Sequence, residues 1–346
     1  MNTFYAPKFK ASLTGLDLVL HNSILKYLGG ISAHDEWQAR SFSAQTPNPE
    51  AITRLNSQLE KIPQFLQSDE GQQKMKDFMQ ESSNVLLGLF KFDKEWVSRE
   101  YLGGKKFTFV LGFMHTGGSY AMSELCKIHG YNHQDYSSTM TYDSIPRGGE
   151  IHYIDTPGYL KQVLFDFAQY ITWVKREQNN LLHVVHKSIN STVCISLLNG
   201  IFGEDANFFI TIRNPLHSAH AFKKLESFKD SSTPPAWENI LITKGFVTKE
   251  KFDQIDFYEK CILWWTYIYE KAAHDIRQVK NRVHIARYDQ TMPDTIKEYA
   301  KAHRVNNFVP DAMDTEQDYS FEDKHIEQAQ KAMDYINQCF ETSLSA

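Results

Sequence analysis

Short apolar runs alternate with amphipathic stretches over residues 105–300, and this pattern predicts buried strands joined by helices. The apolar runs have the length of strands and are rich in aromatic and β-branched residues. They occupy residues 107–113, 181–185, 207–212 and 283–289. Helical periodicity occurs at residues 121–129, 160–175, 192–202, 257–279 and 321–340. Because strands and helices alternate, the sequence predicts an α/β fold with a parallel sheet flanked by helices.

The first 104 residues have helical periodicity and no strand pattern. Apolar residues recur at helical spacing in the segments 13–28, 52–62 and 72–90, and Gly29 and Gly30 follow the first as a stop. We therefore expect residues 1–104 to form a helical N-terminal extension and residues 105–346 to form the α/β domain. The extension is expected to pack on the domain as a cap or an oligomerisation surface. A role in binding an acceptor is the alternative.

Two polar segments lie between the predicted elements. Residues 131–157 mix histidines, aspartates, tyrosines and an arginine, which suits a binding loop at the carboxyl edge of a sheet or an exposed connection. Residues 227–256 include the run SSTPP at 231–235 and suit either a lid over a site or a mobile loop. The spacing of the residues does not decide between the alternatives in either segment.

Composition limits the classes of partner. The chain has 346 residues, 42% of them hydrophobic, and a net charge of -5, so it can bury a large core but gives no general reason to expect nucleic acid. No signal-peptide pattern opens the sequence and no apolar run reaches the ~18 residues of a membrane span, so we expect a cytoplasmic protein without a membrane partner. The cysteines form no CxxC pair, which predicts reduced thiols and neither a disulfide framework nor a metal site. They are Cys126, Cys194, Cys261 and Cys339.

A glycine-rich turn, residues 112–119, joins the first predicted strand to a helix. It has the G-x-x-x-x-G spacing of a phosphate-binding loop. Gly117 and Gly118 let backbone N–H groups approach an anion, and the N-terminus of the following helix adds a partial positive charge of about half a unit. Gly118 stands where a nucleotide triphosphatase carries its lysine. The turn therefore predicts a phosphate or sulfate site, and a plain tight turn is the alternative.

Polar residues also follow the next two predicted strands. The segment HKS, residues 186–188, follows the second strand, and the segment RNP, residues 213–215, follows the third. The carboxyl ends of parallel strands meet at one edge of the sheet, where α/β proteins bind ligands. We therefore expect the glycine-rich turn, Lys187 and Arg213 to come together.

These segments resemble the sulfotransferase family, enzymes that move a sulfuryl group from 3′-phosphoadenosine-5′-phosphosulfate (PAPS) to an acceptor. The resemblance covers residues 107 to about 300 and implies a P-loop-containing, sulfotransferase-like α/β domain. The segments that agree in kind, order and approximate spacing are FMHTGGSY (113–120), VVHKS (184–188), NFFITIRNPLHSAHAF (207–222) and HIARYDQ (284–290).

The resemblance implies which residues hold PAPS. The turn would hold the 5′-phosphosulfate through its backbone and the side chains of Thr116 and Ser119, and Arg213 would pair with the 3′-phosphate, which suits a planar guanidinium. Ala221 stands where the family has a serine, and Ser218 lies one helical turn before it and could substitute. The residues expected to bind PAPS are His115, Thr116, Gly117, Gly118, Ser119, Tyr120, Arg213 and Ser218.

Three residues are candidates for catalysis. Negative charge builds on the bridging oxygen as the leaving phosphate departs, and a fixed donor aimed there is worth roughly 3 kcal/mol. Lys187 is the main candidate donor. His115 replaces the Lys or Arg of the family and can act as a donor only when protonated, which a bound bisphosphate should favour. His186 or a residue of 131–157 would accept the acceptor's proton. As neighbours on a strand, His186 and Lys187 should face opposite sides unless a turn brings both inward.

The sequence thus predicts a PAPS-dependent sulfotransferase that acts on a hydroxyl or amine of a small molecule, such as a secondary metabolite. A P-loop kinase acting on a small molecule is the first alternative, although it should carry a lysine where the chain has Gly118. A nucleotide-binding relative without catalysis is the second, because it would explain His115 and Ala221.

Overall fold

A four-stranded, all-parallel sheet lies at the centre of the protein, with strand order β2-β1-β3-β4. The computed structural model describes residues 28–33, 49–136, 157–177, 180–223, 235–288, 291–313 and 319–345. The strands are β1 (Lys106–Gly112), β2 (His183–Lys187), β3 (Ala206–Ile212) and β4 (Val283–Arg287). The predicted α/β fold, with a parallel sheet flanked by helices, is confirmed.

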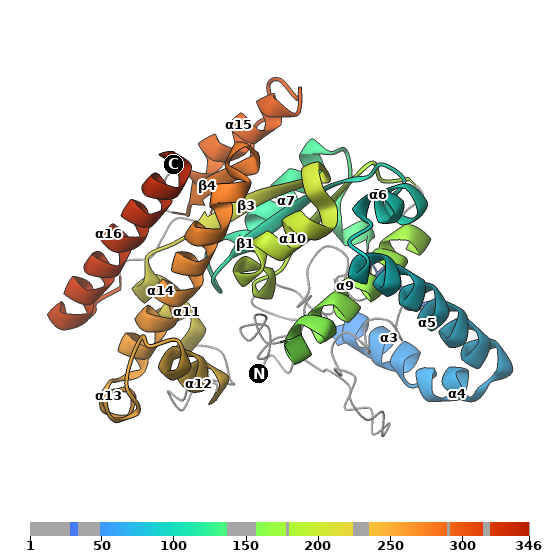
Figure 1. Ribbon diagram of the computed structural model, residues 1–346, viewed down its shortest axis with the longest axis horizontal. Coiled ribbons are helices and arrows are strands. Elements are labelled where there is room, and N and C mark those ends of the chain that lie inside the picture. Colours follow the sequence, from blue (N-terminus) through green and yellow to red (C-terminus); the bar gives the residue numbers. More distant parts are fainter. Residues whose placement is uncertain are drawn as a thin grey trace.

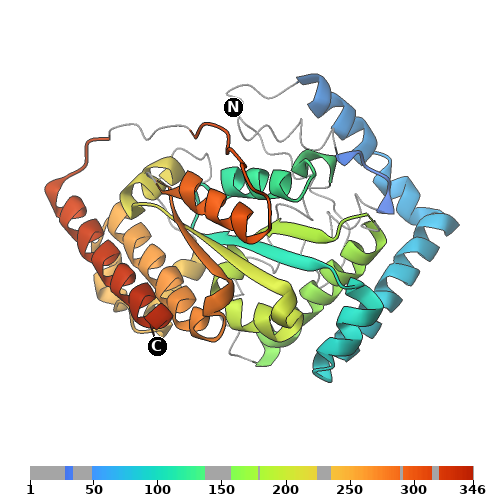
Figure 2. The same cartoon turned by 90° about the horizontal axis from the view of Figure 1, so that it is seen from above.

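Helices cover both faces of the sheet (Figures 1 and 2). The helices α7 (Gly118–Ile128) and α15 (Met292–Ala302) pack on one face, and α9 (Pro157–Glu177), α10 (Ile195–Phe202) and α14 (Phe257–Asp275) pack on the other. Alternate strand residues point to opposite faces, so each strand contributes to both layers. The strand residues on the α7 face include Val110, Val185, Phe209 and Ala286. Those on the α9 face include Phe107, Phe109, Val184, Phe208 and Ile210.

The order of the strands creates a switch point between β1 and β3. Strand β1 pairs with β2 on one side and with β3 on the other, so the chain leaves β1 in one direction and returns across it to form β3. In open α/β sheets ligands bind outside the carboxyl ends of the strands at such a point. The glycine-rich turn that follows β1 lies there.

The described helices before β1 pack on the α/β domain. They are α3 (Pro49–Leu59), α4 (Ile62–Gln67), α5 (Asp69–Phe90) and α6 (Lys94–Val97), followed by the π-helical turn η1 (Ser98–Leu102). Phe78 and Val85 of α5 belong to the main hydrophobic core. Glu81 pairs with Lys175 at 3.1 Å and with Arg176 at 2.8 Å on α9. The helix predicted at 13–28 lies outside the described residues except for Leu28.

The second half of the chain adds further helices around α14. They are α11 (Pro215–Lys223), α12 (Pro235–Thr243), α13 (Lys249–Gln254) and α16 (Asp323–Ser345), and α16 runs along α14 (Figure 1). Short 3₁₀ turns are η2 (His133–Asp135), η4 (Asn190–Val193), η5 (Gly203–Asp205), η7 (Ile276–Gln278) and η8 (Lys280–Arg282).

None of the described helices is long and apolar enough to cross a membrane. The four cysteines are free thiols, as predicted, and all but Cys339 are buried.

The polar segments differ from the sequence prediction where the structure describes them. In the expected lid or mobile loop, residues 235–243 form α12 and residues 249–254 form α13, and α12 buries Trp237, Ile240 and Leu241 at helical spacing. The binding loop expected at 131–157 is described only to residue 136, and residues 137–156 lie outside the described part of the chain. The Tyr131 hydroxyl accepts a hydrogen bond from Val185 N at 2.9 Å, so the start of this segment covers β2.

Candidate functional site

The turn after β1, residues Phe113–Ser119, is held in shape by hydroxyl groups from the surrounding elements, and we call it the glycine loop. Thr116 is buried, and its hydroxyl donates to Phe113 O at 2.7 Å and lies 2.8 Å from Thr211 Oγ1 of β3. Tyr269 of α14 accepts from Phe113 N at 3.0 Å and donates to Thr211 O. The Thr116 side chain, which was expected to contact a ligand, instead holds the loop in shape. The backbone of the loop remains available to face a ligand.

Gly117 is required by its conformation and by its surroundings. It precedes the first residue of α7 with φ +83°, a region that side chains disfavour. A Cβ at this position would lie 2.4 Å from the Tyr288 ring and 3.0 Å from Met292 Cε. The close approach lets α7 begin directly at the loop. The N–H groups of a helix's first turn have no acceptor within the helix, so this end of α7 can receive an anion.

Lys187 comes from the neighbouring strand to the place that a side chain at Gly118 would occupy. It ends β2 opposite Val110 of β1, on the face covered by α7. A Cβ built on Gly118 would lie 2.9 Å from Lys187 Cε. The loop lacks a lysine of its own, and β2 supplies one at the same point.

Arg213 follows β3 and contacts the glycine loop directly. Its Nη1 donates to His115 O at 3.0 Å, and its guanidinium lies 4.3 Å from the centre of the Tyr288 ring. The carbonyl of Arg213 accepts from Trp265 Nε1 at 3.1 Å. A cation over an aromatic face is worth ~0.5–1 kcal/mol at an exposed site and limits where the guanidinium can move. Arg213 is therefore positioned beside the loop before any ligand binds.

His115 is neutral at pH 7 in this arrangement. Desolvation, followed by the positive charges of Lys187 and Arg213, lowers the pKa of its imidazole to about 4. The residue is exposed at the surface, which weakens the desolvation, but the two cations act in the same direction. His115 also has a positive φ of 59°, a strained conformation for a residue with a Cβ. The proton expected on His115 thus requires a bound anion.

Two other predicted residues, His186 and Tyr120, have their contacts outside this group. His186 is buried beside Phe109 and Tyr170, with ring centroids 6.1 and 4.8 Å away, on the face of the sheet opposite to Lys187. The β2 strand includes both His186 and Lys187, so no turn brings them to one side, and the role of His186 as a base beside Lys187 is not supported. The Tyr120 hydroxyl donates to Asp311 O at 2.7 Å.

Ser218 is fully buried in α11, and its hydroxyl has no hydrogen-bond partner among the described residues. Ser119, the second residue of α7, is partly buried at the start of the helix. Ser218 belongs to α11, which begins directly after the Arg213 segment, and Ser119 belongs to the glycine loop.

Tyr288 is a site residue that the sequence analysis did not identify. It follows β4, donates its backbone N–H to Ile212 O at 2.8 Å, and lies against both Arg213 and Gly117. The sequence analysis placed Tyr288 inside the predicted strand 283–289, whereas β4 ends at Arg287 and Tyr288 directly follows it. All four strands therefore contribute to one edge.

The groups gathered at this edge favour an anionic ligand. Two cationic side chains, the first turn of α7 and a glycine cradle converge on the same loop, although the whole chain has a net charge of -5.

A cavity of about 330 Å³ lies elsewhere, between α11, α14 and α16, and its lining includes Lys223, Tyr258 and His325. None of the predicted site residues lines it. We take the chemistry of the edge, rather than this cavity, as the guide to function.

Replacement of Gly117 by alanine is expected to destabilise the protein by about 1–3 kcal/mol, because the new Cβ would collide with the Tyr288 ring. Urea unfolding measures the loss. Gly130→Ala is a matched control, since Gly130 has φ +80° but nothing within 4 Å of a built Cβ. Equal losses in the two variants would attribute the effect to backbone strain alone and contradict the close approach.

No family model matches the chain, and no curated protein matches it either.

Proposed function

We propose that the protein is a sulfotransferase that uses PAPS and transfers the sulfuryl group to a hydroxyl or amine of a small-molecule acceptor, in the cytoplasm. The observation that carries the proposal is the position of Lys187, which lies beside Gly118 at the start of α7. Many bacterial members of the family that the sequence resembles place a lysine at the end of this strand, facing the sulfate, and Lys187 holds that position here. Arg213 at the end of the third strand supports the same proposal.

The residues at the edge fit the charges of PAPS. The co-substrate has two anionic ends, a 5′-phosphosulfate and a 3′-phosphate. The glycine cradle at Gly117 and Gly118 and the first turn of α7 would hold the phosphosulfate, with Lys187 beside it. Arg213 would pair with the 3′-phosphate, for which a guanidinium offers two parallel N–H donors.

PAPS supplies an activated sulfuryl group when it is bound. The transfer forms a bond from the acceptor oxygen or nitrogen to sulfur and breaks the bond from sulfur to the 5′-phosphate oxygen. Lys187 would stabilise the charge that develops on that oxygen, a contribution of roughly 3 kcal/mol for one fixed donor. The acceptor's proton has to leave to a base, and we do not assign this role to His186 because it faces the other side of the sheet.

The first alternative, a P-loop kinase, fits the edge less well. Such enzymes place a lysine in the loop and hold Mg²⁺ with an aspartate of a second motif. Here the loop position is Gly118, whose side-chain space is occupied, and the third strand is followed by Arg213. The second alternative, a nucleotide-binding relative without catalysis, shares the proposed site and differs only in activity.

Sulfate transfer tests the proposal directly. The protein is incubated with PAPS carrying labelled sulfate and with a metabolite extract of the host cell, and products heavier by one SO₃ are identified by mass spectrometry. We expect at least one labelled product, which would also identify the acceptor. Binding of adenosine 3′,5′-bisphosphate without any labelled product would instead favour the non-catalytic relative.

Protonation of His115 should couple to binding of the bisphosphate. Desolvation and the charges of Lys187 and Arg213 lower the pKa of His115 without a ligand, and two phosphates beside it should raise this pKa, so binding takes up a proton at pH values between the two. The affinity for adenosine 3′,5′-bisphosphate should therefore rise as the pH falls from 8 to 5, beyond the change caused by the phosphates themselves. A His115→Gln variant should show only the latter change. Identical pH profiles in calorimetry would exclude a cationic role for His115.

A further inference from the structure

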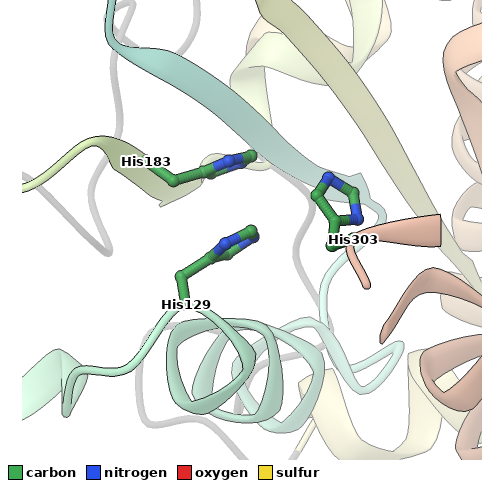
Figure 3. Close-up of side chains that lie close together, drawn as sticks. All are labelled: His129, His183 and His303. Carbon is green, nitrogen blue, oxygen red and sulfur yellow. The ribbon is translucent and has the colours of Figure 1, made fainter. Parts of the chain in front are cut away.

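Three histidines from three separate elements meet at the amino edge of the sheet, away from the glycine loop. His183 begins β2, whereas His129 and His303 directly follow α7 and α15. Figure 3 shows the His129 and His183 side chains lying next to each other, with His303 near the tips of both. One ring nitrogen from each histidine lies within 4.8 Å of the other two. Each of the three residues is partly exposed, so an ion could reach the group from solvent.

The spacing of the rings is close to that of a metal site. The His129 and His183 rings stack with centroids 3.6 Å apart, and the His303 ring stands perpendicular to His129 at 5.1 Å. Tetrahedral Zn²⁺ binds imidazole nitrogens at ~2.0–2.1 Å, which places two ligand nitrogens ~3.4 Å apart. One nitrogen of each ring lies within 4.8 Å of the other two, so rotation of the rings would have to shorten these separations to ~3.4 Å.

Hydrogen bonds around the group orient the rings as the surroundings of metal-binding histidines do. His303 Nδ1 lies 2.9 Å from the carbonyl of Tyr299, which can only accept, so Nδ1 carries the proton and Nε2 keeps its lone pair. His129 Nε2 lies 2.9 Å from the Tyr299 hydroxyl, and His183 Nε2 lies 2.7 Å from Thr108 Oγ1. Because each hydroxyl can accept from Nε2, the second nitrogen of these two rings can also present a lone pair.

We propose that His129, His183 and His303 form a binding site for one divalent transition-metal ion. Imidazole ligands suit zinc, copper and nickel, and three histidines leave a fourth position for water. Such an ion would tie the ends of α7 and α15 to the start of β2. Strand β2 runs from this site to Lys187, a distance of ~13 Å over four residues, so the ion would not contact the glycine loop.

A second group close enough to hold an ion does not carry the same inference. Asp256, Glu259 and His325 meet at the start of α14. There Asp256 accepts from Glu259 N at 3.1 Å as a helix cap and pairs with Lys324 at 2.9 Å. The carboxylates are thus already used by the helix and by a lysine. Of the two groups found among the described residues, only the three histidines contain no carboxylate.

Zinc binding tests the proposal. The full chain is freed of metal with a chelator and titrated with ZnCl₂ by calorimetry, as wild type and as His129→Ala, His183→Ala and His303→Ala. We expect one Zn²⁺ per chain in the wild type and more than ~10-fold weaker binding in each variant. His284→Ala is the matched control, because His284 also packs on Tyr299, with ring centroids 5.1 Å apart, but is not one of the three ligands. It should bind zinc as the wild type does.

Two results would overturn the proposal: no zinc binding by the wild type, or binding by His303→Ala as tight as that of the wild type. His303 lies just past the end of α15, so its replacement should leave the fold unchanged, which circular dichroism checks. A Co²⁺ spectrum of the wild type gives a second readout that needs no variant. Visible absorption of four-coordinate Co²⁺ is expected, and its absence would count against the three-histidine geometry.

Discussion

Lys187→Ala is expected to lower the rate of sulfuryl transfer by about 10²–10³-fold and to leave the fold intact. The ammonium group is the proposed main donor to the oxygen that gains negative charge. Lys187 ends a strand and is only partly buried, so its removal creates no large cavity in the core. The rate is measured as labelled product per unit time, and circular dichroism reports the fold.

Lys301→Ala is the control for the loss of a positive charge, because Lys301 is exposed on α15. Its turnover should equal that of the wild type. A Lys187→Ala enzyme with near-normal turnover would remove this lysine from the mechanism and leave it as a binding residue at most.

Arg213→Ala is expected to weaken the binding of adenosine 3′,5′-bisphosphate by about 10–100-fold, because a hydrogen bond to a charged group is worth ~1.5–3 kcal/mol. The affinity for adenosine 5′-monophosphate, which has no 3′-phosphate, should change much less. Arg213→Lys should restore only part of the affinity, since lysine keeps the charge but loses the planar fork and its stacking on Tyr288. Calorimetry with the two nucleotides measures both effects.

Tyr288→Phe serves as the control for the ring contact, because phenylalanine keeps the aromatic face beneath the guanidinium. It should bind the bisphosphate nearly as the wild type does. Equal losses of affinity for the mono- and bisphosphate in Arg213→Ala would mean that Arg213 does not recognise the 3′-phosphate.

The fold was predictable because the sheet is buried on both faces. Such strands are almost continuously apolar, and three of the four begin within one residue of their prediction. Strand β2 begins two residues later, at His183. Leu182 extends the apolar run but its side chain is 81% exposed, and its carbonyl accepts from Lys106 N of β1 at 2.9 Å. The helices α12 and α13 were missed because each is short and the segment was interpreted as a whole from its run of Ser, Thr and Pro, although Trp237, Ile240 and Leu241 already have helical spacing.

The meeting of the glycine loop, Lys187 and Arg213 at one edge was predictable from topology alone, since parallel strands end on the same side. Contacts that depend on side-chain packing were not. The inward direction of the Thr116 hydroxyl follows from Thr211 on β3, and the stacking of Tyr288 on Arg213 joins two strand ends far apart in the chain. The three histidines of the amino edge have no characteristic spacing in the sequence, because each belongs to a different element.

Binding of adenosine 3′,5′-bisphosphate, compared with ATP, tests the central claim most directly. Calorimetry on the wild-type protein, without added divalent metal and then with Mg²⁺, measures both affinities under the same conditions. The proposed site should bind the bisphosphate in both conditions and at least ~10-fold more tightly than ATP, because Arg213 is placed to pair with a 3′-phosphate. Tighter binding of ATP, or no binding of the bisphosphate, would contradict the proposed function.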